Sequence, residues 1–189
     1  KMLTGDTTAQ IIGFPLPGIV TSGFYSPQAF NVTSSNFPAA GNVPIVYMQD
    51  DAWSGVTEDH LKLWTVNVNW TTPANSTIST AQTLTTSAFT SVFDDGAWDN
   101  LAQPNGGASI DALQATVMNQ AQFRKFPSHN SAVFNFVVNT KTDADKQAGV
   151  RWFELRQSGD GQPWSIYQEG TFTAPNDKHA WNASMGIDI

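Results

Sequence analysis

The sequence has no cysteine among its 189 residues, which excludes thiol catalysis, zinc–thiolate sites and disulfide bonds. It is also poor in charge. Asp, Glu, Lys and Arg together make up 13% of the chain, about half of the usual share. Because Asn, Thr, Ser and Gln must supply most of the polar surface instead, the exterior is expected to be polar but weakly charged.

Basic residues are scarcer than acidic ones, with 9 Lys and Arg against 16 Asp and Glu and a net charge of −7. Nucleic acid is excluded as a partner, since binding its phosphates requires a Lys/Arg footprint. No apolar run approaches the ~20 residues of a membrane-spanning helix, so no membrane span is predicted. The hydrophobic content of 40% indicates a folded protein. A weakly charged, Thr- and Asn-rich composition is common among secreted bacterial proteins.

Apolar and aromatic residues recur along the chain at an offset of 88 residues. The tripeptide Phe30-Asn31-Val32 returns as Met118-Asn119-Gln120, and a third copy, Trp181-Asn182-Ala183, follows 63 residues later. The unit is therefore about 63 residues long, and one copy carries an insertion around Phe89–Ile110. A fixed period of this length is typical of blades and other repeated scaffolds. Three further pairs share the offset of 88: Val46 and Phe134, Trp64 and Trp152, and Ile78 and Ile166.

Alternating apolar and polar residues predict four antiparallel strands in each unit. Only Ile110–Ala115 has an alternative, because its apolar residues also have helical spacing. Several strands carry large apolar groups on both faces, as strands buried between neighbouring layers do. The first unit is predicted to contain strands near Gln28–Thr33, Pro44–Gln49, His60–Trp70 and Ser76–Thr85, and the second near Ala115–Phe126, Ser131–Thr140, Gly149–Gln157 and Trp164–Thr173.

Successive four-stranded units predict an all-β fold, a partial β-propeller made of antiparallel blades. Two full units cannot close a ring of roughly 4–8 blades, so the chain is expected to be a fragment of one propeller-like domain. The alternative is a β-sandwich whose halves resemble each other. The predicted units are residues 24–88 and 111–174, with an insertion at 89–110 and partial blades at 1–23 and 175–189. The partial blades would contribute strands at Gln10–Phe14 and His179–Ile189.

A series of short motifs carries a family resemblance over most of the chain. It resembles the central part of large secreted bacterial proteins, many from Bacteroidetes, that carry adhesion repeats and end in a type IX secretion sorting domain. The resemblance implies a secreted or surface-displayed propeller-like domain whose partners include the remaining blades of its parent chain. It supplies no catalytic motif. The motifs are Lys1–Gln10, Leu61–Trp64, Phe123–Phe126, Ala148–Leu155 and Trp164–Phe172.

Two acidic loops are candidate Ca²⁺ sites, because Ca²⁺ takes about six to eight oxygen ligands, often from carboxylates. The first contains Asp50 and Asp51, directly after a predicted buried strand. The second contains Asp94 and Asp95 inside the insertion. The alternative is that these residues form turns, since Asp favours turns by bonding its own backbone.

Seven tryptophans offer indole faces on which a sugar ring could stack. Those at equivalent repeat positions, such as Trp64 and Trp152, are expected to pack in the core. Trp53, Trp98 and Trp164 lie nearer to strand ends or loops and are the predicted ligand-binding residues, with Trp70 in a similar position.

Catalytic residues are harder to identify. A glycoside hydrolase needs two carboxylates flanking the scissile bond, and Glu154 and Glu169 qualify if they face a channel. A cross-strand ion pair for Glu154 and solvent exposure for Glu169 are the structural alternatives. His129 and His179 precede predicted strands, where they are expected to bond a neighbouring turn.

These features favour a secreted or cell-surface adhesion module that recognises glycan or a surface protein, without catalysis. One alternative is a carbohydrate-active hydrolase. The other is a structural component of a surface assembly, which exposed apolar edges at Gln10–Phe14 or Met185–Ile189 would favour.

Overall fold

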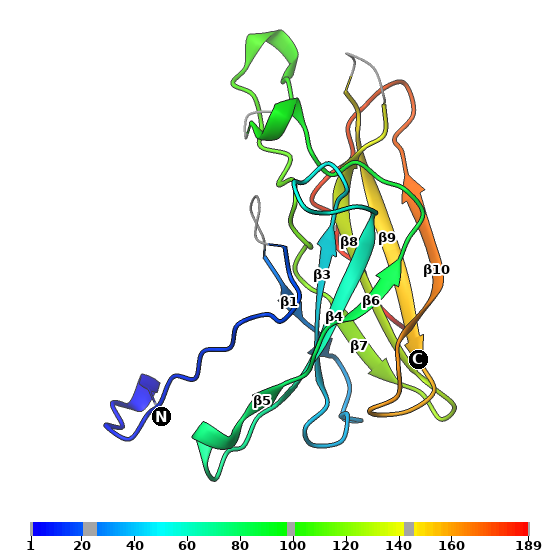
Figure 1. Ribbon diagram of the computed structural model, residues 1–189. Coiled ribbons are helices and arrows are strands. Elements are labelled where there is room, and N and C mark those ends of the chain that lie inside the picture. Colours follow the sequence, from blue (N-terminus) through cyan, green and yellow to red (C-terminus); the bar gives the residue numbers. More distant parts are fainter. Residues whose placement is uncertain (1, 21–25, 98–100, 142–145, 189) are drawn as a thin grey trace.

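Two β-sheets form the body of the chain in the computed structural model, which describes residues 2–20, 26–97, 101–141 and 146–188 (Figure 1). The first sheet has the order β1-β3-β4-β5, with β6 also paired to β4, and the second has the order β10-β9-β8-β7-β2. Their strands are β1 (Gln28–Ala29), β3 (Val43–Gln49), β4 (His60–Asn67), β5 (Thr77–Ile78) and β6 (Gln82–Thr85), then β2 (Asn31–Val32), β7 (Gln122–Lys125), β8 (Asn130–Asn139), β9 (Ala148–Gln157) and β10 (Ser165–Phe172).

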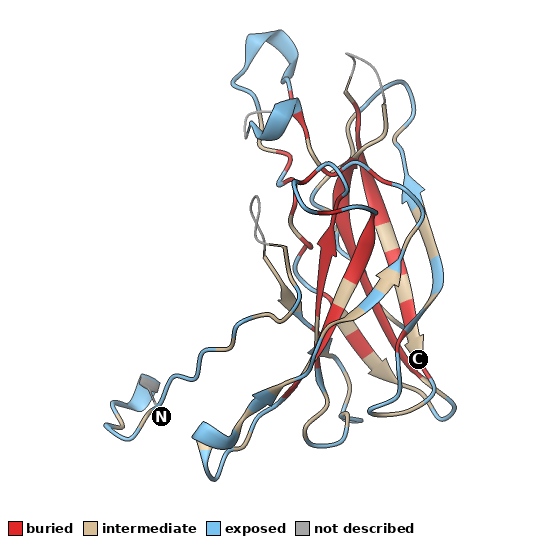
Figure 2. Ribbon diagram, viewed as in Figure 1, coloured by how far each residue is buried: buried red, intermediate tan, exposed pale blue. Residues whose placement is uncertain are grey.

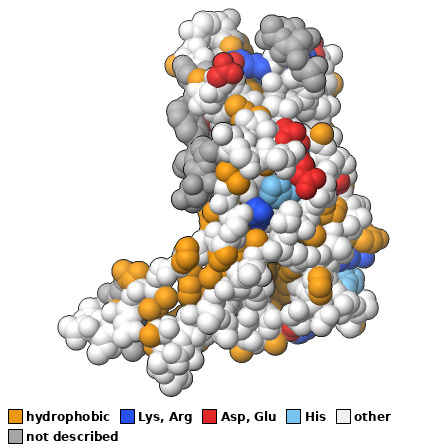
Figure 3. Space-filling view, in the orientation of Figure 1, with side chains coloured by type: hydrophobic (Ala, Val, Ile, Leu, Met, Phe, Trp, Pro, Cys, Tyr) orange, Lys and Arg blue, Asp and Glu red, His pale blue; other side chains and the backbone are white. Residues whose placement is uncertain are grey.

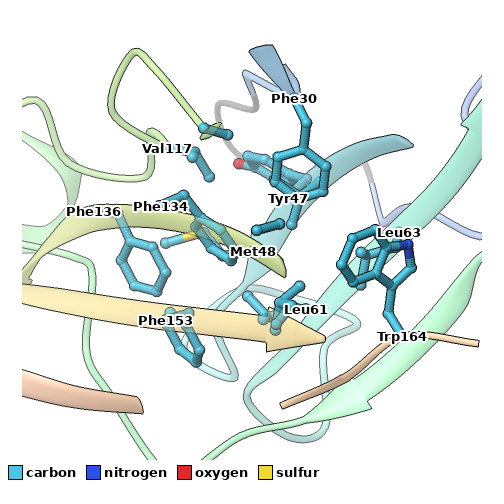
Figure 4. Packing of buried hydrophobic residues seen from close by; sticks show 14 of the residues in the cluster. Phe30, Tyr47, Met48, Leu61, Leu63, Val117, Phe134, Phe136, Phe153 and Trp164 are labelled. Atoms are coloured by element: carbon cyan, nitrogen blue, oxygen red, sulfur yellow. The ribbon is translucent and has the colours of Figure 1, made fainter. Parts of the chain in front are cut away.

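The two sheets pack face to face over one apolar core. Alternate residues of the central strands point inward, among them Met48 of β3, Leu61 of β4, Phe134 of β8 and Phe153 of β9 (Figure 4). The ring of Phe153 lies 5.4 Å from that of Phe134 and 5.6 Å from that of Phe136. Buried residues are accordingly concentrated in β3, β4, β8 and β9 (Figure 2). The all-β prediction is confirmed. Of its two forms the sandwich fits, since the described residues build no propeller ring.

The offset of 88 residues relates the β3–β4 hairpin of the first sheet to the β8–β9 hairpin of the second sheet. Val46 in β3 and its repeat partner Phe134 in β8 both face the core. The hairpins differ in register, because Val46 lies opposite Leu63 whereas Phe134 lies opposite Phe153. The residue 88 positions after Leu63 is Arg151, two residues from Phe153. A register shift of two residues leaves every side chain on the same face of its strand, so residues related by the offset of 88 still face the same way.

The predicted strand Gln28–Thr33 is divided between the sheets. Its first part is β1, which pairs with β3, and its last part is β2, which pairs in parallel with β7. The chain crosses from one sheet to the other at Phe30, which is buried, with its ring 6.2 Å from that of Phe134. Crossing lets one short segment close the same edge of both layers.

The terminal segments cover the outer faces of the sheets, and the strands predicted in them are absent from the described residues. On the first sheet, Trp64 Nε1 donates to the carbonyl of Pro17 at 2.9 Å. On the second, Asn135 Nδ2 donates to the carbonyl of Ala183 at 3.2 Å. The outward-facing Trp64 is buried for this reason, whereas Trp152 is only partly covered.

The insertion forms a small lobe at one end of the sandwich, with two short 3₁₀ turns, η3 (Asp94–Gly96) and η4 (Pro104–Gly106) (Figure 1). Phe93 and Leu101 anchor it in a second apolar cluster. The alternative helix at Ile110–Ala115 does not form. Leu113 and Ala115 have φ angles of 53° and 56°, which lie in the left-handed region and interrupt a right-handed helix. The remaining 3₁₀ turns are η1 (Met2–Thr4) and η2 (Pro73–Asn75).

Within the described ranges, no helix is both long and apolar enough to cross a membrane.

Candidate functional site

The structure places Asp50 and Asp51 beside Asp59, which was not among the predicted metal ligands. One carboxylate oxygen from each lies within 4.8 Å of the others. The grouping arises because Asp50 and Asp51 directly follow β3 and Asp59 directly precedes β4, at the same end of one hairpin. Asp50 and Asp59 are buried and Asp51 is exposed.

The buried carboxylates already accept hydrogen bonds on all of their oxygens. Asp50 Oδ2 accepts from the amide of Ser91 at 2.5 Å and its hydroxyl at 2.8 Å, and Asp50 Oδ1 accepts from the amide of Ala52 at 2.8 Å. Asp59 accepts from the amides of Asp51 and Phe89 at 2.9 and 2.7 Å. Burial raises the pKa of Asp59, and the charges of the Asp50 and Asp51 carboxylates raise it further. The two hydrogen bonds lower this pKa but do not offset the increase. The cluster therefore ties the segment at 89–91 to the end of the first sheet.

The other predicted calcium loop is separate from this cluster. Asp94 and Asp95 lie in η3 of the insertion, where the carboxylate of Asp94 forms an ion pair with Lys146. Calcium binding at either loop stays a prediction. The Asp50 cluster holds three carboxylates, and Ca²⁺ would need about three to five further oxygens there.

The predicted ligand-binding tryptophans are in different settings. Trp53 is buried and its ring lies 6.1 Å from that of Tyr47, so it packs in the fold, and it is not among the residues that line the groove described below. Trp98 lies outside the described residues. Trp164 lines a groove, described below.

The acidic candidates for catalysis are held in ion pairs on the second sheet. Glu154 pairs at 2.6 Å with Arg156, which is on the same strand and not across the sheet as expected. Glu169 is not solvent-exposed as expected, because it pairs at 2.5 Å with Arg151 on the neighbouring strand. Each pair joins residues on the same face of the sheet. Glu154 and Arg156 are two residues apart on one strand, and Arg151 is the diagonal neighbour of Glu169, because Glu169 lies opposite Phe153.

The histidines before strands have structural contacts. His179 Nδ1 accepts from the amide of Ala148, at the start of β9, at 3.1 Å. Burial lowers the pKa of His179, and the charges of Lys146 and Lys141 lower it further. The ring of His129 stacks on Phe126 at 5.0 Å in the turn between β7 and β8.

A groove with a volume of about 470 Å³ opens between the first sheet and the turn from β9 to β10. Its apolar floor is formed by Leu63, Phe123 and Trp164. The rings of Phe123 and Trp164 meet edge to face at 6.2 Å. Gln82 fixes this floor, because its amide accepts from the backbone nitrogen of Trp164 at 3.0 Å and donates to the backbone oxygen at 2.7 Å.

The rim of the groove is polar and uncharged. Asn42, Ser79, Thr80 and Gln162 contribute to it, and no acidic or basic side chain is among the described residues that line it. Amides and hydroxyls both donate and accept hydrogen bonds. The arrangement can therefore hold a small neutral ligand that has an apolar face and several hydroxyl groups.

Asp160 holds the walls of the groove together. Its carboxylate accepts from Lys125 Nζ at 2.6 Å, the amide of Ala39 at 2.8 Å and Asn130 Nδ2 at 2.8 Å. Burial raises the pKa of Asp160, but these hydrogen bonds outweigh burial, so the pKa lies below its ordinary value of 3.8. One carboxylate thus joins the turn after β9 to the loop before β3 and to β7 and β8.

The substitution Asp160→Asn is expected to lower the free energy of unfolding by about 1–2 kcal/mol at neutral pH, since Lys125 loses a charged acceptor. Because the folded pKa is lowered, this contribution is complete above the unfolded pKa near 3.8 and is lost as the pH falls through the folded pKa. The difference from the wild type should therefore shrink from about pH 5 to about pH 2 in urea unfolding. A difference that stays constant over this range contradicts the role. The raised pKa of Asp59 acts in the opposite direction but is common to both proteins.

The groove was not predicted from the sequence, although the chain carries a signal for it. No Asp, Glu, Lys, Arg or His occurs between Asp6 and Asp50, or between Lys62 and Asp94. These two segments supply most of the first sheet and the side of the groove that it forms. The distribution of charged residues along the chain, rather than their total number, thus indicates that this half of the molecule has an uncharged surface.

Comparison of the chain with models of known protein families, with curated proteins and with solved structures finds no match.

Proposed function

We propose that this chain is a secreted or cell-surface binding module that recognises a neutral glycan in the groove above Trp164. The observation that carries the proposal is the combination of an apolar floor with a rim of amides and hydroxyls and without charge. The low charge content of the whole chain is consistent with a neutral ligand.

The chemistry of sugars matches this groove. A sugar ring has an apolar C–H face, which packs on aromatic or aliphatic side chains, and hydroxyl groups that need partners able to donate and accept. The volume of about 470 Å³ falls within the range of roughly 300–1,000 Å³ that is typical of small-molecule sites. An anionic ligand would lack a counter-charge on the described rim.

Binding is favoured over hydrolysis by the positions of the acids. Neither Glu154 nor Glu169 is among the residues that line the groove, and each forms an ion pair with an arginine. A hydrolase would need two carboxylates at about 5–10 Å from each other across the bound sugar.

Binding is tested with a panel of neutral and anionic oligosaccharides, by calorimetry and by tryptophan fluorescence. Thr80 is exposed on the rim, so Thr80→Trp fills the groove without disturbing the core. We expect this variant to weaken binding of a neutral oligosaccharide more than tenfold, equivalent to about 1.4 kcal/mol. Gln162→Ala, which removes one rim amide, should weaken it by roughly fivefold.

The control variants carry the same replacements elsewhere. Thr57→Trp adds an indole at an exposed turn outside the groove, and Gln103→Ala removes an exposed amide from the insertion. Both should bind like the wild type. The proposal fails if no neutral oligosaccharide binds, or if Thr80→Trp binds as tightly as Thr57→Trp.

A further inference from the structure

A second surface, separate from the groove, is formed by an N-terminal arm and a β-hairpin. The arm is residues 7–15, and the hairpin is residues 66–78, which includes β5 and η2. Both extend away from the sandwich and lie near each other (Figure 1). We call residues 7–15 and 66–78 together the arm–hairpin surface.

Large apolar side chains on this surface are left in solvent. Ile11 is 82% exposed and Trp70 is 88% exposed, so folding of the chain buries neither side chain, and contiguous exposed apolar side chains mark interaction sites. Ile12 and Val68 are also exposed. In the space-filling view, orange side chains gather over this part of the molecule (Figure 3).

A hollow lies directly beside the most exposed of these side chains. It has a volume of about 400 Å³, and Ile12 and Phe14 of the arm and Val68 of the hairpin line it together with Trp70. The surface thus presents an exposed indole and an apolar hollow next to each other. A protruding group and a receiving hollow on one patch make that patch complementary to itself, which is the requirement for a two-fold interface.

This surface is also free of charge, as is most of the first sheet. Residues 7–15 and 66–78 contain no acidic or basic side chain, although the chain carries a net charge of −7. Two copies that met through the acidic segments of the chain would bring like charges together. Two copies that meet here bury no charge, and buried interface cores are typically depleted in charged residues.

We propose that the arm–hairpin surface is a self-association site, at which Trp70 of one copy packs into the hollow of a second copy and the second copy does the same in return. This dimer is independent of the glycan proposal, because none of the residues that line the hollow lines the groove. Pairing would also place two glycan grooves on one particle, which raises the avidity for a repetitive ligand.

Sedimentation velocity of the whole chain, from about 1 μM to about 1 mM, tests this proposal. The wild type is expected to show a concentration-dependent monomer–dimer equilibrium. Trp70→Ser removes the indole, and Ile12→Glu places a charge in the hollow. We expect each variant to weaken dimerisation more than tenfold, because aromatic anchors at interface centres carry a large share of the binding energy.

Phe172→Ser is the matched control, since Phe172 is 56% exposed on β10 of the other sheet. It should dimerise like the wild type. Circular dichroism should show that the exposed substitutions leave the fold unchanged. A wild type that stays monomeric over the whole range, or a dimer that survives both Trp70→Ser and Ile12→Glu, overturns the proposal.

Discussion

Replacing Asp50 with alanine is expected to lower the free energy of unfolding by about 3–5 kcal/mol. Asp50 is fully buried, and its carboxylate accepts hydrogen bonds from the amide and hydroxyl of Ser91 and from the amide of Ala52. Alanine leaves these donors without an acceptor in a part of the fold that water does not reach. It also frees the segment around Ser91 from the end of the first sheet.

Urea unfolding followed by circular dichroism measures this effect. The matched control is Asp51→Ala, since Asp51 is the next residue and its side chain is exposed. Its free energy of unfolding should change by less than about 0.5 kcal/mol. Similar losses in the two variants would show that Asp50 acts through the general charge of the loop and not through its hydrogen bonds.

The substitution Arg151→Met is expected to destabilise the fold by about 2–3 kcal/mol, since it removes one partner of a largely buried ion pair. The side chains of Arg151 and Glu169 are 8% and 20% exposed. Methionine keeps much of the packing of Arg151 on Phe153, whose ring centre lies 5.3 Å from the guanidinium. The loss therefore reports the carboxylate of Glu169 left without its cation, together with the hydrogen bonds from Arg151 to the Thr171 hydroxyl and the Ser87 carbonyl.

A double-mutant cycle with Glu169→Gln isolates the interaction. The double variant should be less destabilised than the two single losses added together, by about 1 kcal/mol or more. Arg156→Met is the control, because Arg156 is 33% exposed in its pair with Glu154 and such pairs contribute at most about 1 kcal/mol. Strictly additive losses for Arg151 and Glu169 would contradict the coupling.

Strand positions could be predicted because they depend on neighbouring residues. The apolar run at Val133–Val138 is buried on both faces of β8, as expected for a strand between two covering layers. The repeat offset likewise placed Trp64 and Trp152 on equivalent faces, because alternation along a strand is a local property. The calcium, glycan and secretion predictions remain untested.

The candidate sites were less predictable because their parts are far apart in the sequence. Asp59 receives its hydrogen bond from Phe89, 30 residues away, and Asp50 receives its own from Ser91, 41 residues away. Trp53 and Trp164 both lie beside strand ends, yet one is stacked on Tyr47 and the other lines a groove. Spacing along the chain carries no information about which loop packs over which ring.

The chain's own pattern of side chains was thus enough to establish an all-β protein with little charge, since alternation and composition act over short distances. The predicted four-stranded units became two five-stranded sheets, because β2 pairs with β7 of the second sheet. Whether those sheets would stand side by side or face to face was settled by packing. The inward-facing rings of Phe134, Phe136 and Phe153 exclude water only against the opposite sheet. The terminal segments then cover outer faces that would otherwise be exposed, and the groove and the arm–hairpin surface are the places that this covering leaves open.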